Sequence, residues 1–94
     1  MKYQVLLMGE NFEIISDGRV QNLGFFATRF VKANSDEEAE YKAVELIKND
    51  SSLKSMMADN SKLTPKIYLE GLSSARWWKK LGGEGYSFFN MEED

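Results

Sequence analysis

The chain contains neither histidine nor cysteine, and these two absences narrow the chemistry that it can perform. Without histidine it lacks the commonest general base near neutral pH. Without either residue it lacks the ligands of almost every transition-metal site, and disulfide bonds and thiol catalysis are excluded as well. We therefore expect no resident transition metal and no redox-active thiol.

Long apolar runs are also missing from the sequence. Near the N-terminus the longest run is the four residues Val5 to Met8, which is too short for the apolar core of a signal peptide. Nothing in the chain approaches the roughly 20 apolar residues that a membrane-spanning helix needs. We therefore expect a cytoplasmic protein with no membrane partner.

Basic residues are slightly outnumbered by acidic ones, with 12 Lys and Arg against 15 Asp and Glu, so the net charge is -3. This balance gives no overall attraction to nucleic acids or to anionic membranes. Hydrophobic residues make up 43% of the chain, which is enough for one core in 94 residues. We expect a single α+β domain over residues 1–94, in which residues 92–94 form a short acidic tail.

The clearest structural signal is a change of hydrophobic period near residue 35. From residue 24 to residue 32, successive side chains alternate between two faces, as they do in a strand. One of these faces carries Phe25, Ala27, Arg29 and Val31. Ser35 then predicts a helix start, because its hydroxyl can accept from the Glu38 amide while the Glu38 carboxylate reaches back to the Ser35 amide. The segment predicts one strand, one cap and one helix that continues to Lys48.

Upstream of this junction, the alternation over residues 3–8 predicts a first strand. Apolar residues occur on both of its faces, so we expect it to lie inside the sheet. Gly9 to Asn11 predicts a bulge or bend, and Asp17-Gly18 predicts a two-residue hairpin turn. A β-meander is the simplest arrangement, with the first and third segments as neighbours.

The helix at residues 36–48 is expected to pack on one face of the sheet. Its apolar stripe consists of Ala39, Ala43, Leu46 and Ile47, with Val44 at the margin. Phe30 and either Val5 or Leu6 are expected to complete the core beneath that stripe. Asp50 or Ser51 can cap a short second helix. The apolar contacts of that second helix are predicted to be Leu53, Met56 and Met57.

Two further strands are predicted in the C-terminal part of the chain. Pro65 is placed at the start of a strand over residues 66–72, in which Ile67 and Leu69 point inward. A glycine-rich turn over residues 82–85 precedes a last strand at 86–91, which we expect at an edge of the sheet. The predicted fold is thus a mostly antiparallel sheet, with a β-meander, then the helix, then two strands, and with one main helix on one face.

The most unusual local composition is the run Arg76, Trp77, Trp78, Lys79 and Lys80. In the plainest interpretation both indoles pack in the core while the cations extend to solvent. As a functional segment, the run would anchor a protein partner, because Trp and Arg are favoured at interface centres. Alternatively it would stack on the bases and neutralise the phosphates of a single-stranded nucleic acid. Of these two functions, protein contact is favoured, because a net charge of -3 attracts phosphate weakly.

No motif in the sequence predicts catalysis. The acidic runs at 36–38 and 92–94 lack the spacing of a calcium loop, and the first of them is explained by helix capping. The glycines at 82–85 lack the Lys-Ser or Lys-Thr that follows a phosphate-binding loop. We therefore predict a non-enzymatic domain without a cofactor or a bound metal.

The junction from Val31 to Ala39, Val-Lys-Ala-Asn-Ser-Asp-Glu-Glu-Ala, follows a strand and a hairpin and resembles the junction of small bacterial HicB-like domains. In that family a similar acidic, Ser/Thr-capped segment leads from sheet to helix. The resemblance covers roughly residues 2–47. The sequence departs from the family because it lacks the usual Pro and Gly-Cys segment and any C-terminal DNA-binding motif. The resemblance implies an α+β fold and an antitoxin-like role in binding another protein, and it carries over no catalytic residue.

Three hypotheses for the function follow. The favoured one is a small module for protein–protein interaction or self-association. The second is a single-stranded nucleic-acid binder that uses the segment from Arg76 to Lys80. The third is a small-ligand domain or an enzyme with a carboxylate base, which a closed apolar pocket with converging polar groups would favour.

Overall fold

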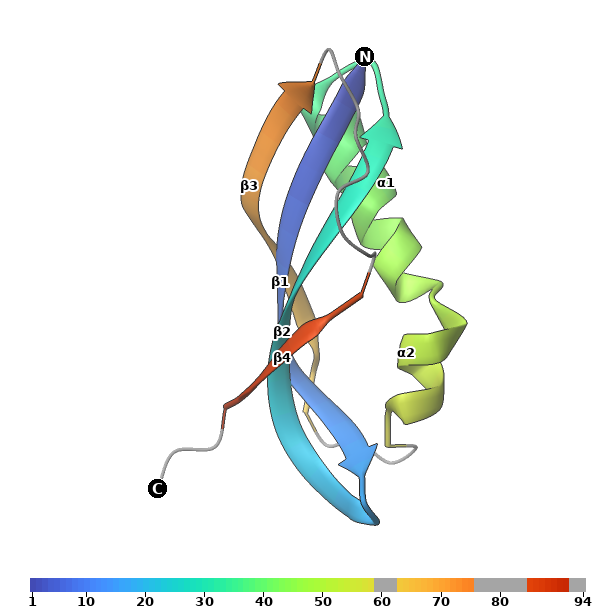
Figure 1. The fold of residues 1–94 in the computed structure, drawn as a ribbon, viewed down its shortest axis with the longest axis vertical. Coiled ribbons are helices and arrows are strands. Elements are labelled where there is room, and N and C mark those ends of the chain that lie inside the picture. Colours follow the sequence, from blue (N-terminus) through green and yellow to red (C-terminus); the bar gives the residue numbers. More distant parts are fainter. Residues whose placement is uncertain (59–62, 76–84, 92–94) are drawn as a thin grey trace.

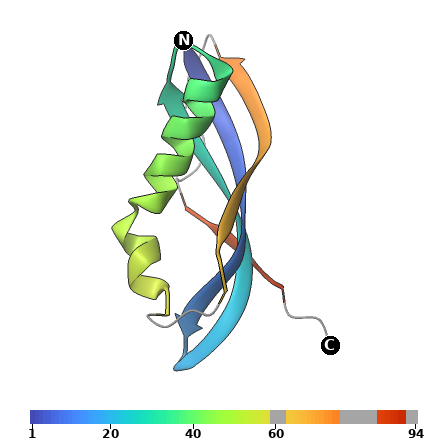
Figure 2. The ribbon, with the colours of Figure 1, turned by 180° about the vertical axis from the view of Figure 1, so that it is seen from behind.

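The computed structural model describes residues 1–58, 63–75 and 85–91, and it has one antiparallel sheet with two helices on one face (Figures 1 and 2). The elements are β1 (Lys2–Ser16), β2 (Arg19–Lys32), α1 (Asp36–Lys48), α2 (Ser51–Met56), β3 (Lys66–Ala75) and β4 (Ser87–Asn90). The strand order across the sheet is β3-β1-β2-β4. The predicted α+β class, with one main helix packed on the sheet, is confirmed. The first strand lies inside the sheet, as expected.

β1 and β2 form one long hairpin and not a meander of shorter strands. The turn between them has Asp17 at φ 53° and Gly18 at φ 74°, the left-handed conformations that a two-residue hairpin turn requires. The register shifts between Gly9 and Phe12, which is the predicted bulge. A bulge bends a strand without ending it, so the segments before and after it stay in one strand.

Two glycines in the hairpin make room for aromatic rings on neighbouring strands. Gly9 pairs with Phe25, and a Cβ atom at Gly9 would collide with the Phe25 ring. Gly24 pairs with Phe89, and a Cβ atom there would collide with the Phe89 ring. Both glycines are therefore needed for close approach, and the second one lets β4 lie against β2.

α1 begins at a capped turn, as predicted. The Ser35 hydroxyl accepts a hydrogen bond from the Glu38 amide at 3.1 Å. The Glu38 carboxylate was expected to accept a hydrogen bond from the Ser35 amide. It accepts instead from the amide of the preceding residue, Asn34, at 3.3 Å. Glu38 also forms an ion pair with Lys42, one helical turn further on, at 3.1 Å between Oε1 and Nζ. The Lys42 ammonium and the Asn34 amide together hold the pKa of Glu38 below its usual value.

The core lies between the helices and the sheet, and two residues predicted for it are placed elsewhere. Its largest fully buried side chains are Phe25, Leu7, Ile47 and Val5. The buried stripe of α1 contains Ala39, Ala43 and Ile47. Leu46 directly precedes Ile47 and is rotated from it by about 100° around the helix axis, so it is 48% exposed. Phe30 is half-buried and, by strand alternation, lies on the sheet face opposite the buried Arg29.

The C-terminal half agrees with the prediction in its order of elements and differs in detail. Asp50 caps α2, whose buried residue is Leu53. Leu69 lies opposite the buried Leu7 and therefore on the core face, as predicted, yet it is 40% exposed because β3 is an edge strand and the helices leave part of it uncovered (Figure 2). β3 also extends to Ala75, three residues beyond its predicted end. β4 is an edge strand as predicted, with only four residues.

None of the helices in the described part of the chain is both long enough and apolar enough to span a membrane.

Candidate functional site

The segment that the sequence singled out, Arg76 to Lys80, lies outside the described residues. Its contact with a partner therefore stays a prediction. In the described part of the chain, the chemistry-bearing features are an apolar groove beside β3 and a polar cluster on the other side of the core.

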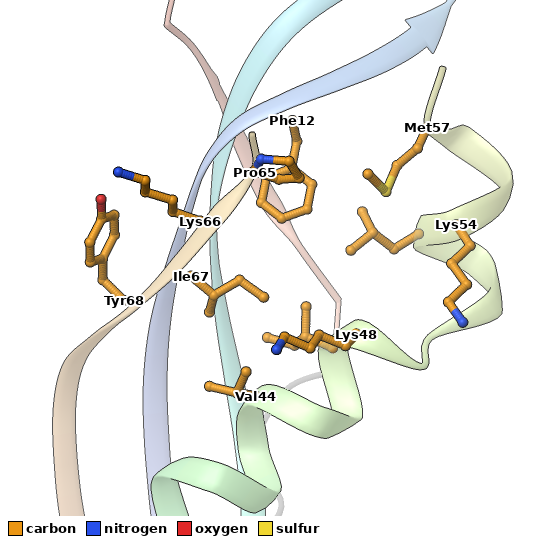
Figure 3. Close-up of a pocket in the computed structure, with 11 residues that line it drawn as sticks. Phe12, Val44, Lys48, Lys54, Met57, Pro65, Lys66, Ile67 and Tyr68 are labelled. Carbon is orange, nitrogen blue, oxygen red and sulfur yellow. The ribbon is translucent and has the colours of Figure 1, made fainter. Parts of the chain in front are cut away.

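The groove lies between the helix layer and β3, and its volume is about 590 Å³ (Figure 3). We call it the β3 groove. Its lining residues are Phe12, Val44, Ile47, Lys48, Leu53, Lys54, Met57, Pro65, Lys66, Ile67 and Tyr68. Carbon surface predominates because most of these side chains are aliphatic or aromatic.

Local sequence explains how the helix wall of the groove arises. Val44 and Ile47 are three residues apart on α1, so their side chains lie on neighbouring positions of one helix face. The Asp50 cap starts a new helix, which redirects the chain so that Leu53 reaches the core. After α2, Met57 bridges to Ile14 of β1, which holds the end of the helix layer against the sheet.

The opposite wall is the edge strand β3. Figure 3 shows the Ile67 side chain directed toward the helices, whereas those of Lys66 and Tyr68 point away from them. β3 pairs with β1 on its inner side, and no second strand of the described residues pairs with its outer side. The groove is therefore bounded by a strand edge whose backbone groups are unpaired within the described sheet.

The electrostatic character of the groove is opposite to that of the chain as a whole. Among the described residues that line it, Lys48, Lys54 and Lys66 carry a positive charge and none carries a negative charge. Lys48 and Lys54 belong to the helix wall (Figure 3). The groove therefore combines an apolar floor with a cationic border.

A separate polar cluster joins Arg29, Asp50 and Tyr86. Arg29 is 3% exposed, and its Nη1 donates to the Thr28 carbonyl at 2.7 Å. Its guanidinium lies 5.1 Å from the centre of the Tyr86 ring, and its Nη2 lies 3.8 Å from Asp50 Oδ2. Tyr86 donates its hydroxyl hydrogen to the same Asp50 oxygen at 2.6 Å. Every member of this cluster is engaged with another member.

The protonation states of this cluster favour a structural role. Burial, followed by the hydrogen bond to Asp50, raises the pKa of Tyr86 to about 12. The hydrogen bond from Tyr86 in turn holds the pKa of Asp50 below its usual value. At neutral pH the phenol is a fixed donor and the carboxylate a fixed acceptor, so neither group exchanges a proton in the range where an acid–base catalyst works.

Sequence reasoning did not find this cluster or the β3 groove. The alternation with Phe25, Ala27 and Val31 did place Arg29 on what became the buried face, and a charged residue on such a face requires a partner. That partner comes from a distant loop, which the pattern cannot identify. Within residues 1–58, 63–75 and 85–91, no three carboxylate side chains gather as a metal site would require.

No protein-family model, no curated protein and no solved structure matches the chain. The similarity to HicB-like domains therefore stays a hypothesis drawn from the junction between sheet and helix.

Proposed function

We propose that the protein is a non-enzymatic module that binds an extended segment of another protein along β3. The observation that carries this proposal is the open outer edge of β3 beside the apolar β3 groove. In strand addition, backbone hydrogen bonds to a sheet edge supply affinity, and pockets for alternate side chains supply specificity. β3 provides the edge and the groove provides the pocket.

The two edges of the sheet differ in how much strand they offer. β3 has ten residues, whereas β4 has four. At roughly 3.3 Å per residue, the longer edge can pair with a segment of several residues and the shorter one with very few. β3 is therefore the favoured edge, although the sequence alone had placed only the last strand at an edge of the sheet.

The groove would receive the side chains of the added segment that face the helices. Val44, Ile67 and Met57 are partly buried and border the groove, so an apolar side chain placed there removes carbon surface from water. Buried apolar anchors of this kind supply most of the energy of an interface. Pairing of β3 with β3 of a second copy is the competing use of the same edge.

Two other functions receive less support from the described residues. A single-stranded nucleic acid would need exposed aromatic rings that face the groove for stacking. Of the two described aromatic residues that line it, Phe12 is only 4% exposed, and Tyr68 is 40% exposed but points away from the helices (Figure 3). A small substrate would need several polar groups converging on a closed pocket, whereas the polar side chains at this open groove are lysines on its border. Protein binding fits both the apolar floor and the strand edge.

The test is to select peptides from a random displayed library on the full-length chain and to map the strongest binder by NMR. We expect amide shifts along β3 and at the groove residues, with the β4 amides unchanged. Val44→Glu, which places a carboxylate in the groove, should abolish binding. Leu46→Glu is the matched control on the solvent side of the same helix, and it should bind as the natural protein does.

Three outcomes would contradict the proposal. The first is a selection that yields only peptides whose shifts map outside β3 and the groove. The second is a sedimentation experiment that shows a dimer which β3 substitutions dissociate and which takes no peptide. The third is a single-stranded oligonucleotide that binds with steep salt dependence where no peptide binds, which would favour the segment from Arg76 to Lys80 instead.

A further inference from the structure

We infer that the segment bound in the β3 groove carries acidic side chains on either side of an apolar anchor. This inference rests on the proposed strand addition at β3 and adds the chemical class of the partner. It is carried by the charge of the groove, by the lack of ion-pair partners for Lys48 and Lys54 among the described residues, and by the positions of these two lysines.

The charge of the groove is inverted relative to the protein. The chain has a net charge of -3, yet the described residues that line the groove include Lys48, Lys54 and Lys66 and no Asp or Glu. The positive local field attracts carboxylates and repels basic segments, whereas the negative net charge of the whole protein repels acidic segments and attracts basic ones. A partner with an acidic segment is the complement of this surface.

The lysines of the helix wall are available for such a partner. The ion pairs of the described residues join Arg29 with Asp50 and Lys42 with Glu38, so neither Lys48 nor Lys54 is neutralised within that part of the chain. Both residues are exposed, so their side chains can reorient toward a ligand without breaking an ion pair of the described residues. Lys66 lies opposite Glu10 in the register of β3 with β1, and its side chain points away from the helices (Figure 3).

The positions of the two lysines explain why acidic residues would flank an apolar one. Lys48 ends α1 and Lys54 lies on α2, so they border the groove at different points along its helix wall (Figure 3). The carbon surface of the groove floor lies between the helix wall and β3. In an extended segment, every second side chain faces the same way. An acidic–apolar–acidic series at alternate positions would match this arrangement.

The same lysines would attract phosphate, and the groove itself favours the peptide. Nucleic-acid grooves of this kind pair cations with exposed aromatic rings. Here Phe12 is buried at 4% exposure, and the Tyr68 ring, although 40% exposed, points away from the helices (Figure 3). An apolar floor without a stacking surface fits an aliphatic side chain between two carboxylates.

The experiment uses three acetylated and amidated peptides that differ only at two positions. Their cores are Glu-Thr-Leu-Thr-Glu, Gln-Thr-Leu-Thr-Gln and Lys-Thr-Leu-Thr-Lys, and binding to the full-length chain is followed by NMR. We expect the acidic peptide to bind about three- to tenfold more tightly than the neutral one, the scale of two solvent-exposed charge pairs. The basic peptide should bind most weakly, and added salt should reduce the acidic preference.

Charge-matched variants assign the preference to the groove. Lys48→Gln combined with Lys54→Gln should remove the preference for the acidic peptide. Arg19→Gln combined with Lys32→Gln removes the same amount of charge at exposed positions outside the groove, and it should leave the preference intact.

The outcomes separate this inference from the proposed function. If acidic and neutral peptides shift the β3 amides equally well, strand addition stands and the acidic partner is excluded. If no peptide of any composition shifts those amides, strand addition itself fails and the inference fails with it. If a single-stranded DNA with the same net charge as the acidic peptide displaces that peptide from the groove, the lysines bind nucleic acid and the peptide assignment is overturned.

Discussion

The Tyr86 hydroxyl donates a hydrogen bond to the Asp50 carboxylate at 2.6 Å, and this contact ties the chain just before β4 to the link between α1 and α2. Asp50 uses its other oxygen to accept from the Ser52 amide, at 2.9 Å, which starts α2. One carboxylate therefore fixes both the second helix and the entry into the last strand. Arg29 lies beneath them and supplies the compensating charge.

Removal of the Tyr86 hydroxyl should lower stability. Tyr86→Phe keeps the ring contact with Phe25, at 5.0 Å between centroids, but removes the hydrogen bond to a charged acceptor. We expect the free energy of unfolding to fall by about 1–2 kcal/mol in urea denaturation. Tyr41→Phe, at a residue that is 65% exposed, is the control and should change little. Equal effects of the two substitutions would exclude the role assigned to Tyr86.

The same hydroxyl predicts a loss of stability at alkaline pH. Burial and the hydrogen bond to Asp50 raise the pKa of Tyr86 from 10.0 to about 12. The unfolded chain loses this proton near pH 10, so the contribution of Tyr86 is complete below that pH and is lost as the pH rises toward 12.

The measurement is the free energy of unfolding across that pH range for the natural protein and for Tyr86→Phe. We expect the decline above pH 10 to be shallower in the variant, because one group with a raised pKa has been removed. Some decline should persist, since the pKa of Tyr3 is also raised. Parallel declines in the two proteins would show that Tyr86 titrates alike in the folded and unfolded chains.

Gly9 should not tolerate a methyl group. Gly9→Ala would force its Cβ against the Phe25 ring, so we expect a loss of about 1–3 kcal/mol from overpacking. Gly71→Ala is the matched control on β3, because there the nearest atom to a new Cβ is the Leu6 Cβ at 3.8 Å. Thermal unfolding of both variants provides the check. If Gly9→Ala unfolded at the same temperature as the natural protein, the Phe25 ring would not pack over Gly9.

Neighbouring residues of α1 should respond very differently to truncation. Ile47 is fully buried and Leu46 is 48% exposed. Ile47→Ala should therefore cost about 2–5 kcal/mol through lost burial and a cavity. Leu46→Ala should stay within about 0.5 kcal/mol, as most surface substitutions do. The measurement is the free energy of unfolding of both variants by chemical denaturation. A larger loss of stability for Leu46→Ala than for Ile47→Ala would show that the buried face of α1 had been assigned wrongly.

The features predictable from sequence were those set by local backbone chemistry. Asp17-Gly18 makes a hairpin turn because both residues adopt positive φ with little cost. Ser35 and Asp50 cap helices because a short side chain with an oxygen atom can accept from amides two or three residues on. The bulge near Gly9 and the order of strands and helices follow from breaks in the hydrophobic period.

What could not be predicted depends on contacts between distant parts of the chain. Leu46 and Ile47 are both apolar, and only the approach of α1 to the sheet decides which of them is buried. Leu69 has the pattern of an inward residue, yet the helices do not extend over it. The β3 groove likewise requires α1, α2 and β3 to be placed together, and no single segment encodes that spacing.

The central claim is that β3 accepts an extended acidic segment, and amide hydrogen exchange in the presence of the Glu-Thr-Leu-Thr-Glu peptide tests it most directly. In a strand at a sheet edge, alternate amides point outward and exchange with solvent. We predict that the outward amides between Lys66 and Ala75 become protected in the complex, while those of Ser87 to Asn90 stay unchanged. Saturation of the protein by the peptide without any new protection in β3 would contradict the account.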